Sequence, residues 1–153
     1  MMWAQYATYA MAVVLIAAIV IELRTGKIPN WLTLVPFVLF IAVATSVEDR
    51  VSLMWQLGFA VAVFGVGLLL FAFAGFGAGA VKLMSGLALF LPLSKIYWTL
   101  GLFIGSVFIL AFILQQLRKA IAGENSAWHA LRTKGLPMSL PIGATGFLVM
   151  FVI

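Results

Sequence analysis

The chain has 153 residues, of which 65% are hydrophobic and 8% are charged, and this composition excludes a water-soluble domain of that size. A helix needs about 20 mostly apolar residues to cross a hydrocarbon core roughly 30 Å thick, so the length allows about six crossings with short connections. We therefore predict an all-α integral membrane protein, a bundle of about six transmembrane helices forming a single domain over residues 1–153.

Several kinds of site are excluded by side chains that the chain lacks or has only once. The absence of cysteine excludes disulfides, thiolate metal sites and a cysteine nucleophile. The single histidine, His129, argues against a zinc site, so we expect neither a metal nor another cofactor. The net charge of +5 does not indicate nucleic acid, because the basic residues lie in loops and at the ends of apolar runs. Membrane lipid is the partner that this pattern predicts.

Six apolar runs follow one another along the chain. We predict spans at residues 3–21, 31–47, 54–74, 80–94, 96–116 and 138–153. The fourth span is short, and we expect Pro92 to end it. The long polar loop after the fifth span can hold a short interfacial helix around residues 126–132, with Trp128 at the level of the headgroups.

The orientation in the membrane follows from the basic residues, which accumulate near span ends on the cytoplasmic side. The second loop has only Arg50 beside two acids, whereas the first and fifth loops are basic, with Arg24, Lys27, Arg118, Lys119, Arg132 and Lys134. Loops one, three and five are thus predicted to face the cytoplasm, with both termini outside. Glu22 and Ala80 then lie at the same membrane face.

The stretch ELRTGKIPN, residues 22–30, connects the first two spans. We expect Pro29 to hold Ile28 extended and the side-chain oxygen of Asn30 to cap the second span. These residues predict a hairpin between two helices.

Glu22 has two interpretations. Its carboxylate can pair with Arg24 or Lys27 at the interface, which is a structural role. Alternatively it marks a functional site, because an ionisable group at the edge of the hydrocarbon is costly. A single acid does not decide between them.

The stretch FGAGAVKL, residues 76–83, opens the fourth span. Its glycines at positions 77 and 79, with Gly75 before them, can be small residues that let helices approach closely, and Lys82 would then extend toward the headgroups. They can also form a tight turn that holds a polar side chain at position 80. That position carries Ala80.

Together these segments resemble the type IV prepilin peptidases, particularly the short form that serves Flp or Tad pili. That family has an aspartate, a basic turn and IPN after its first span, and a GxGD turn followed by VKL at its fourth. Here ELRTGKIPN and GAGAVKL stand in the same order, and LPMSLPIGATG at 136–146 resembles the opening of the family's last span. The resemblance covers essentially the whole chain. It implies one transmembrane prepilin-peptidase-like domain without the cysteine-bearing N-methyltransferase region of larger members.

Both acidic positions depart from the family pattern. Glu22 stands at the first aspartate and extends the carboxyl by one methylene, about 1.5 Å. Ala80 stands at the second aspartate and has no ionisable group. The turn is typical of one that holds an aspartate, and both an introduced substitution and a natural loss are compatible with its absence.

The resemblance implies an aspartic endopeptidase that cleaves the leader of a prepilin or pseudopilin at the cytoplasmic face of the bacterial inner membrane. Glu22 and position 80 would be the catalytic pair, and no metal is needed. With Ala80 in place we expect little or no activity. If Ala80→Asp restores only part of the activity because the longer Glu22 side chain misplaces its oxygen, we expect Glu22→Asp with Ala80→Asp to restore more. The residues that shape or support the site would be Gly77, Gly79, Lys82, Ile28, Pro29 and Asn30.

Two other classes of protein compete with the peptidase interpretation. A non-catalytic prepilin-binding protein, or an assembly subunit of a pilus or secretion machine, is favoured by Ala80 and disfavoured by the retained acid and intact turn. A small transporter would need a polar residue near the bilayer midplane. The spans offer only serine, threonine, glycine and proline there, with Gln56 and Gln115 near span ends.

Overall fold

The computed structural model describes residues 2–45, 49–121, 129 and 135–152, and this part of the chain is helical and contains no strand. The elements in chain order are α1 (Met2–Thr25), α2 (Asn30–Ala44), α3 (Arg50–Ala74), α4 (Ala78–Ala88), η1 (Leu93–Lys95), α5 (Ile96–Ile121) and α7 (Ser139–Phe151). The all-helical prediction is confirmed, with one α-helix for each apolar run. The interfacial helix expected around residues 126–132 lies outside the described residues, apart from His129.

Three of these helices are long and apolar enough to cross a membrane. They cover Gln5–Thr25, Arg50–Phe73 and, with η1, Leu93–Ala120, while α2, α4 and α7 are shorter apolar helices. Large apolar side chains of α3 and α5 point outward, among them Phe73 and Phe108, which are 87% and 72% exposed. Such a surface suits lipid and not water, so the chain is a membrane protein. Six crossings remain a prediction, because the three short helices do not meet the length of a full span.

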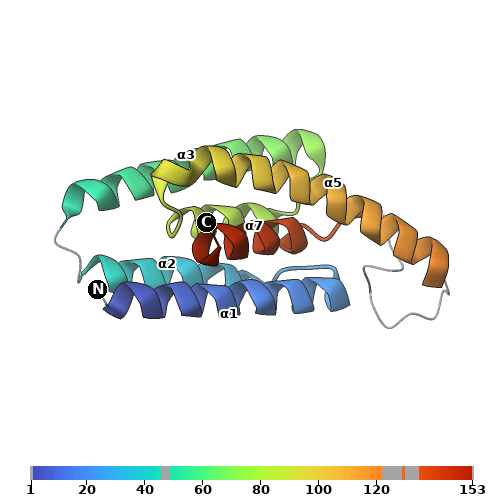
Figure 1. Cartoon of the computed structure of the whole chain (residues 1–153), viewed down its shortest axis with the longest axis horizontal. Coiled ribbons are helices and arrows are strands. Elements are labelled where there is room, and N and C mark those ends of the chain that lie inside the picture. The colour runs from blue at the N-terminus through green and yellow to red at the C-terminus, as the bar shows by residue number, and fades with distance from the viewer. Residues whose placement is uncertain (1, 46–48, 122–128, 130–134, 153) are drawn as a thin grey trace.

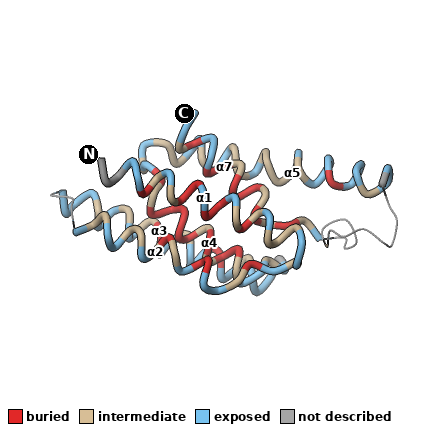
Figure 2. Tube along the Cα trace, turned by 90° about the horizontal axis from the view of Figure 1, so that it is seen from below, coloured by how far each residue is buried: buried red, intermediate tan, exposed pale blue. Residues whose placement is uncertain are grey.

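The helices form three layers, which Figure 1 shows from the side. The short helices α4 and α7 lie in the middle and contact each other. On one side α2 packs on α4 and α1 packs on α7, while on the other side α3 packs on α4 and α5 packs on α7. Buried residues accordingly gather on α4, α7 and the inner face of α1 (Figure 2).

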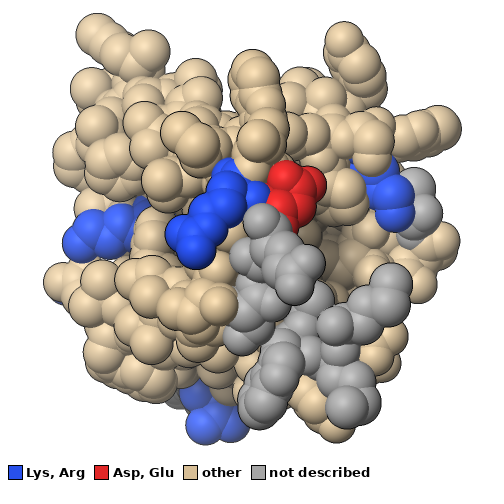
Figure 3. All heavy atoms as spheres, turned by 90° about the vertical axis from the view of Figure 1, so that its left-hand side faces the viewer, with Lys and Arg blue, Asp and Glu red and all other residues tan. Residues whose placement is uncertain are grey.

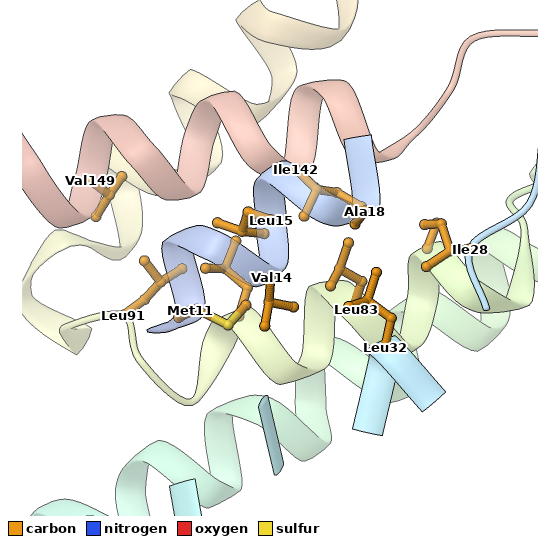
Figure 4. Close-up of a cluster of buried hydrophobic side chains, with 12 residues drawn as sticks. Met11, Val14, Leu15, Ala18, Ile28, Leu32, Leu83, Leu91, Ile142 and Val149 are labelled. Carbon is orange, nitrogen blue, oxygen red and sulfur yellow. The ribbon is translucent and has the colours of Figure 1, made fainter. Parts of the chain in front are cut away.

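The core lies where α1, α2, α4 and α7 converge, and Figure 4 shows its side chains directed toward one another. Met11 and Leu83 are fully buried, and Leu15 and Ile142 are 1% exposed. Lipid tails are as apolar as leucine, so within a membrane these contacts stabilise the bundle by close packing more than by removal from water.

Two helix ends differ from the prediction. Helix α1 continues to Thr25, which places Glu22 on its last turn and not in the loop. Helix α4 ends at Ala88, before the chain reaches Pro92, so the expectation that Pro92 ends this helix is wrong. After Ala88 the chain forms a tighter turn, in which the N–H of Phe90 donates to the carbonyl of Leu87 at 2.9 Å. Pro92 lies beyond this turn and directly precedes η1.

Candidate active site

The three segments that the sequence singled out meet at one end of the bundle. This is the end where α1 finishes and where α2, α4 and α7 begin, at the right of Figure 1. Figure 3 faces the opposite end, where most of the surface is uncharged and one small acidic patch lies beside basic side chains. The predicted site is therefore assembled at a single end from segments far apart in the sequence.

The turn after α1 is fixed by Gly26. Its φ of 74° is left-handed, and its N–H donates to the carbonyl of Glu22 at 2.8 Å, which closes the last turn of the helix. The ring of His129 packs against Gly26, and a Cβ at this position would overlap that ring. Both the backbone conformation and the available space therefore require glycine, and the chain leaves α1 sharply toward α2.

Glu22 is half-buried, and its Oε2 accepts a hydrogen bond from the N–H of Ser139 at 2.7 Å. A carboxylate near the C-terminus of its own helix is disfavoured by the dipole of that helix, whereas the N-terminus of another helix favours it. Ser139 is the first residue of α7. The start of α7 therefore stabilises the negative charge that the end of α1 disfavours.

The amides of the first turn of α7 show why Glu22 fits there. The first four N–H groups of a helix have no partner within it and need other acceptors. Leu140 donates to the carbonyl of Pro137 and Ile142 to that of Met138, each at 3.2 Å, while Pro141 has no N–H. Glu22 supplies the acceptor for the remaining amide, that of Ser139.

The glycine turn of α4 packs directly on the loop after α1. A Cβ at Gly79 would lie 2.9 Å from the Cβ of Ile28 and 3.0 Å from its carbonyl oxygen, so only glycine fits without a shift of the loop. Gly77 differs, because its φ of −70° is ordinary and nothing lies within 4 Å of a Cβ built there. Gly75, with a φ of 71°, ends α3. The close approach between the start of α4 and the loop after α1 therefore depends on Gly79, and not on Gly75 or Gly77.

Ala80 follows that contact and is buried, with 2% of its surface exposed. It belongs to the apolar cluster that also contains Ala18, Ile28 and Leu83 (Figure 4). The structure thus places position 80 at the same end as Glu22 and next to the loop that leaves α1. The surroundings of its methyl group are apolar.

Asn30 and Lys82 bridge the starts of α2 and α4. The Nζ of Lys82 donates to the Oδ1 of Asn30 at 3.0 Å. The predicted capping role of Asn30 is wrong, because extended Pro29 occupies the cap position and Asn30 is already the first helical residue. The side chain of Lys82 accordingly reaches Asn30, and this contact is a second link between the two motifs.

The donors and acceptors at this end include the Glu22 carboxylate, the amide and hydroxyl of Ser139, the pair formed by Lys82 and Asn30, and the hydroxyl of Thr25, which donates to the carbonyl of Ile21 at 2.8 Å. Across the described residues no group of His, Cys, Asp or Glu side chains is arranged to hold a metal ion. Ser139 is not among the residues that the sequence predicts for the site. It lies 117 residues from Glu22, within the proline-rich and glycine-rich segment at 136–146, and no sequence pattern marks a serine for so distant a partner.

Comparison with families of known proteins gives one match. Residues 9–114, more than half of the chain, match the type IV leader peptidase family. The match includes Glu22 and Ala80 and ends before α7. Comparisons with curated proteins and with solved structures found no match. On the extent of the family match, the chain belongs to the type IV leader peptidase family.

Proposed function

We propose that this chain has the architecture of a prepilin leader peptidase, an aspartic endopeptidase that cuts the leader of type IV or Flp prepilins at the cytoplasmic face of the bacterial inner membrane. The observation that carries the proposal is the contact between Gly79 and Ile28, because it brings the glycine turn onto the loop after α1. Membership of a peptidase family supports the same reaction class.

The reaction requires two carboxyl groups and one water molecule. The ionised carboxyl takes a proton from water, the water oxygen attacks the scissile carbonyl carbon, and the protonated carboxyl donates to the carbonyl oxygen. The tetrahedral intermediate then breaks its C–N bond as the first carboxyl passes the proton from water to the leaving nitrogen, and a hydroxyl proton of the intermediate returns to the second carboxyl as the new carbonyl forms. Glu22 suits the ionised role, because the N–H at the start of α7 stabilises its charge. An acid at buried position 80 suits the protonated role.

With Ala80 the chain has one member of this pair. The acid and base roles cannot then be divided, and loss of one positioned proton-transfer group costs about 10²–10⁴-fold in rate. We therefore propose that the chain as it stands is an inactivated form.

The test is cleavage of a co-expressed prepilin in membranes, followed by its shift in electrophoretic mobility. Ala80→Asp is expected to produce cleavage, and Glu22→Gln in that background to abolish it. A prepilin with an altered cleavage site is the substrate control. A folded Ala80→Asp protein that binds prepilin and never cuts it would contradict the peptidase proposal.

A second candidate is a non-catalytic prepilin-binding or assembly protein of a pilus or secretion machine. The observation in its favour is the burial of Ala80, whose methyl group packs within the apolar cluster. Under this proposal the unaltered chain retains prepilin in membranes, and Glu22→Gln leaves retention unchanged. Loss of retention with Glu22→Gln would speak against this candidate.

We further propose a multi-pass topology with both termini outside, because the basic residues of the first and last loops favour the cytoplasm. Reporter fusions at each terminus test it. A cytoplasmic signal from either terminus would overturn the six-span topology and move Glu22 to the wrong side for prepilin leaders.

A further inference from the structure

Ser139 has a buried hydroxyl that differs from the other buried hydroxyls of the described residues. The residue has no exposed surface, and its N–H donates to Glu22 at 2.7 Å. Within the described part of the chain its Oγ has no hydrogen-bond partner. Buried hydroxyl groups in proteins are almost always bonded, to protein or to ordered water, because an unmade bond there is costly.

The other buried hydroxyl residues behave differently. Thr33 donates to the carbonyl of Asn30 at 2.8 Å, and Ser85 donates to the carbonyl of Ala60 at 2.9 Å. Thr145 lies 3.4 Å from the hydroxyl of Ser106. Ser139 is thus the exception among the buried hydroxyl residues of the described chain, and it is the one whose backbone holds Glu22.

We propose that Ser139 holds both the Glu22 carboxylate, through its N–H, and a water molecule shared with that carboxylate, through its hydroxyl. The Oγ is three covalent bonds from the nitrogen that contacts Glu22, which keeps Oγ and the carboxylate within the span of one bridging water. Because Oγ has almost no accessible surface in this structure, binding of the water requires a small rotation of the Ser139 or Glu22 side chain. The role of that water in hydrolysis rests on the proposed function, whereas its binding does not.

The shared water would be oriented for attack. Glu22 accepts one of its hydrogens and Ser139 Oγ accepts the other, since a hydroxyl oxygen has two lone pairs. The lone pairs of the water oxygen are then left for the scissile carbonyl carbon. On attack the proton passes to Glu22, and Ser139 keeps its own.

The first experiment uses the full chain without any peptidase activity. The carboxylate stretching band of Glu22 is isolated by infrared difference spectroscopy against Glu22→Gln in lipid bilayers. Ser139→Ala is expected to shift this band and to leave the melting temperature unchanged, since the hydroxyl has no partner among the described residues of the protein. Ser85→Ala, a matched buried control, is expected to lower the melting temperature and leave the band unshifted. An unshifted band in Ser139→Ala would overturn the proposal.

The second experiment measures cleavage in the Ala80→Asp background. Ser139→Ala is expected to lower kcat by up to about 10²-fold, as for a reacting group misplaced by roughly 1 Å, with KM unchanged. Ser85→Ala is expected to leave kcat unchanged. A shifted band without cleavage in Ala80→Asp would reject the proposed function and keep the assignment of Ser139. Cleavage that Ser139→Ala does not slow, with an unshifted band, would reject the assignment and keep the function.

Discussion

Positions 22 and 80 lie at one end of the bundle, yet their surroundings differ in kind. Glu22 is half-buried, and its carboxylate has a backbone donor at the start of α7. Ala80 is 2% exposed and belongs to a cluster of apolar side chains. Position 22 thus has a donor that stabilises a negative charge, whereas position 80 is surrounded by packed apolar side chains.

The two positions differ in the kind of support that they receive. Glu22 accepts one hydrogen bond from the first amide of α7, whereas the apolar cluster around Ala80 is built from α1, α2, α4 and α7 together. Charge at position 22 therefore depends on one directed contact, and burial at position 80 depends on packing shared by four helices. The substitutions below test these two kinds of support, from the largest expected effect to the smallest.

The largest effect is expected from shortening Glu22 in the Ala80→Asp background. The sequence alone predicts more activity for Glu22→Asp with Ala80→Asp if Ala80→Asp by itself recovers only part of the activity. The 2.7 Å contact with Ser139 now argues the opposite, because a side chain shorter by one methylene cannot keep it. We expect the double variant to cleave prepilin more slowly than Ala80→Asp, by up to about 10²-fold. Rates measured on one prepilin in membranes decide the matter, and a faster double variant would show that the Ser139 contact is dispensable.

The second effect concerns stability at position 80. Ala80→Asp introduces a polar group among apolar neighbours and is expected to lower the free energy of unfolding by about 1–3 kcal/mol. Ala80→Ser, a smaller polar group, is expected to cost less. Unfolding in mild detergent measures both variants. An Ala80→Asp protein as stable as the parent would mean that position 80 is not closed by packing.

Gly79 provides the third test. Gly79→Ala places a methyl group 2.9 Å from the Cβ of Ile28, and overpacking of this kind costs about 1–3 kcal/mol. Gly77→Ala is the matched control, because the space there is open, and is expected to be neutral or to stabilise by about 0.4–1 kcal/mol. Equal effects of the two substitutions on the melting temperature would contradict the close approach of the loop and α4.

The smallest loss of stability is expected from removing the hydrogen bond between Lys82 of α4 and Asn30 of α2. Lys82→Met keeps the long side chain and removes the donor to Asn30. The loss of one neutral-to-charged hydrogen bond on a partly exposed pair is expected to cost about 1 kcal/mol or less. Asn30→Ala should cost the same, and the double variant no more than either single one. Additive losses would show that the two side chains act separately.

The sequence predicted the helices well and their ends less well. Apolar runs located all the described α-helices, because each of these helices lies within an apolar stretch that polar residues, glycine or proline interrupt at its ends. The end of α4 was placed too late, since the run up to Pro92 is apolar whether it is helical or not. The backbone leaves the helix at Ala88, and hydropathy does not report such a turn.

The sequence predicted where the two motifs of the site lie, but not which group contacts Glu22. ELRTGKIPN and GAGAVKL could be placed at one end from charge and order along the chain, and the contact between Ile28 and Gly79 agrees with that placement. The partner of Glu22 could not be predicted, because a backbone N–H has no signature in the sequence. The role of Asn30 was misjudged, since its side chain suits a cap but the extended Pro29 takes that position.

The dependence of Glu22 on α7 has a consequence for exchanging parts between relatives. The residues that match the family, 9–114, contain both motif positions but not the helix whose first amide meets the carboxylate. A chimaera joined at that boundary would pair Glu22 with a foreign last helix, and its success would depend on a free amide at the equivalent of Ser139. Helices α1 and α7 of this chain therefore have to be exchanged together, although most of the sequence separates them.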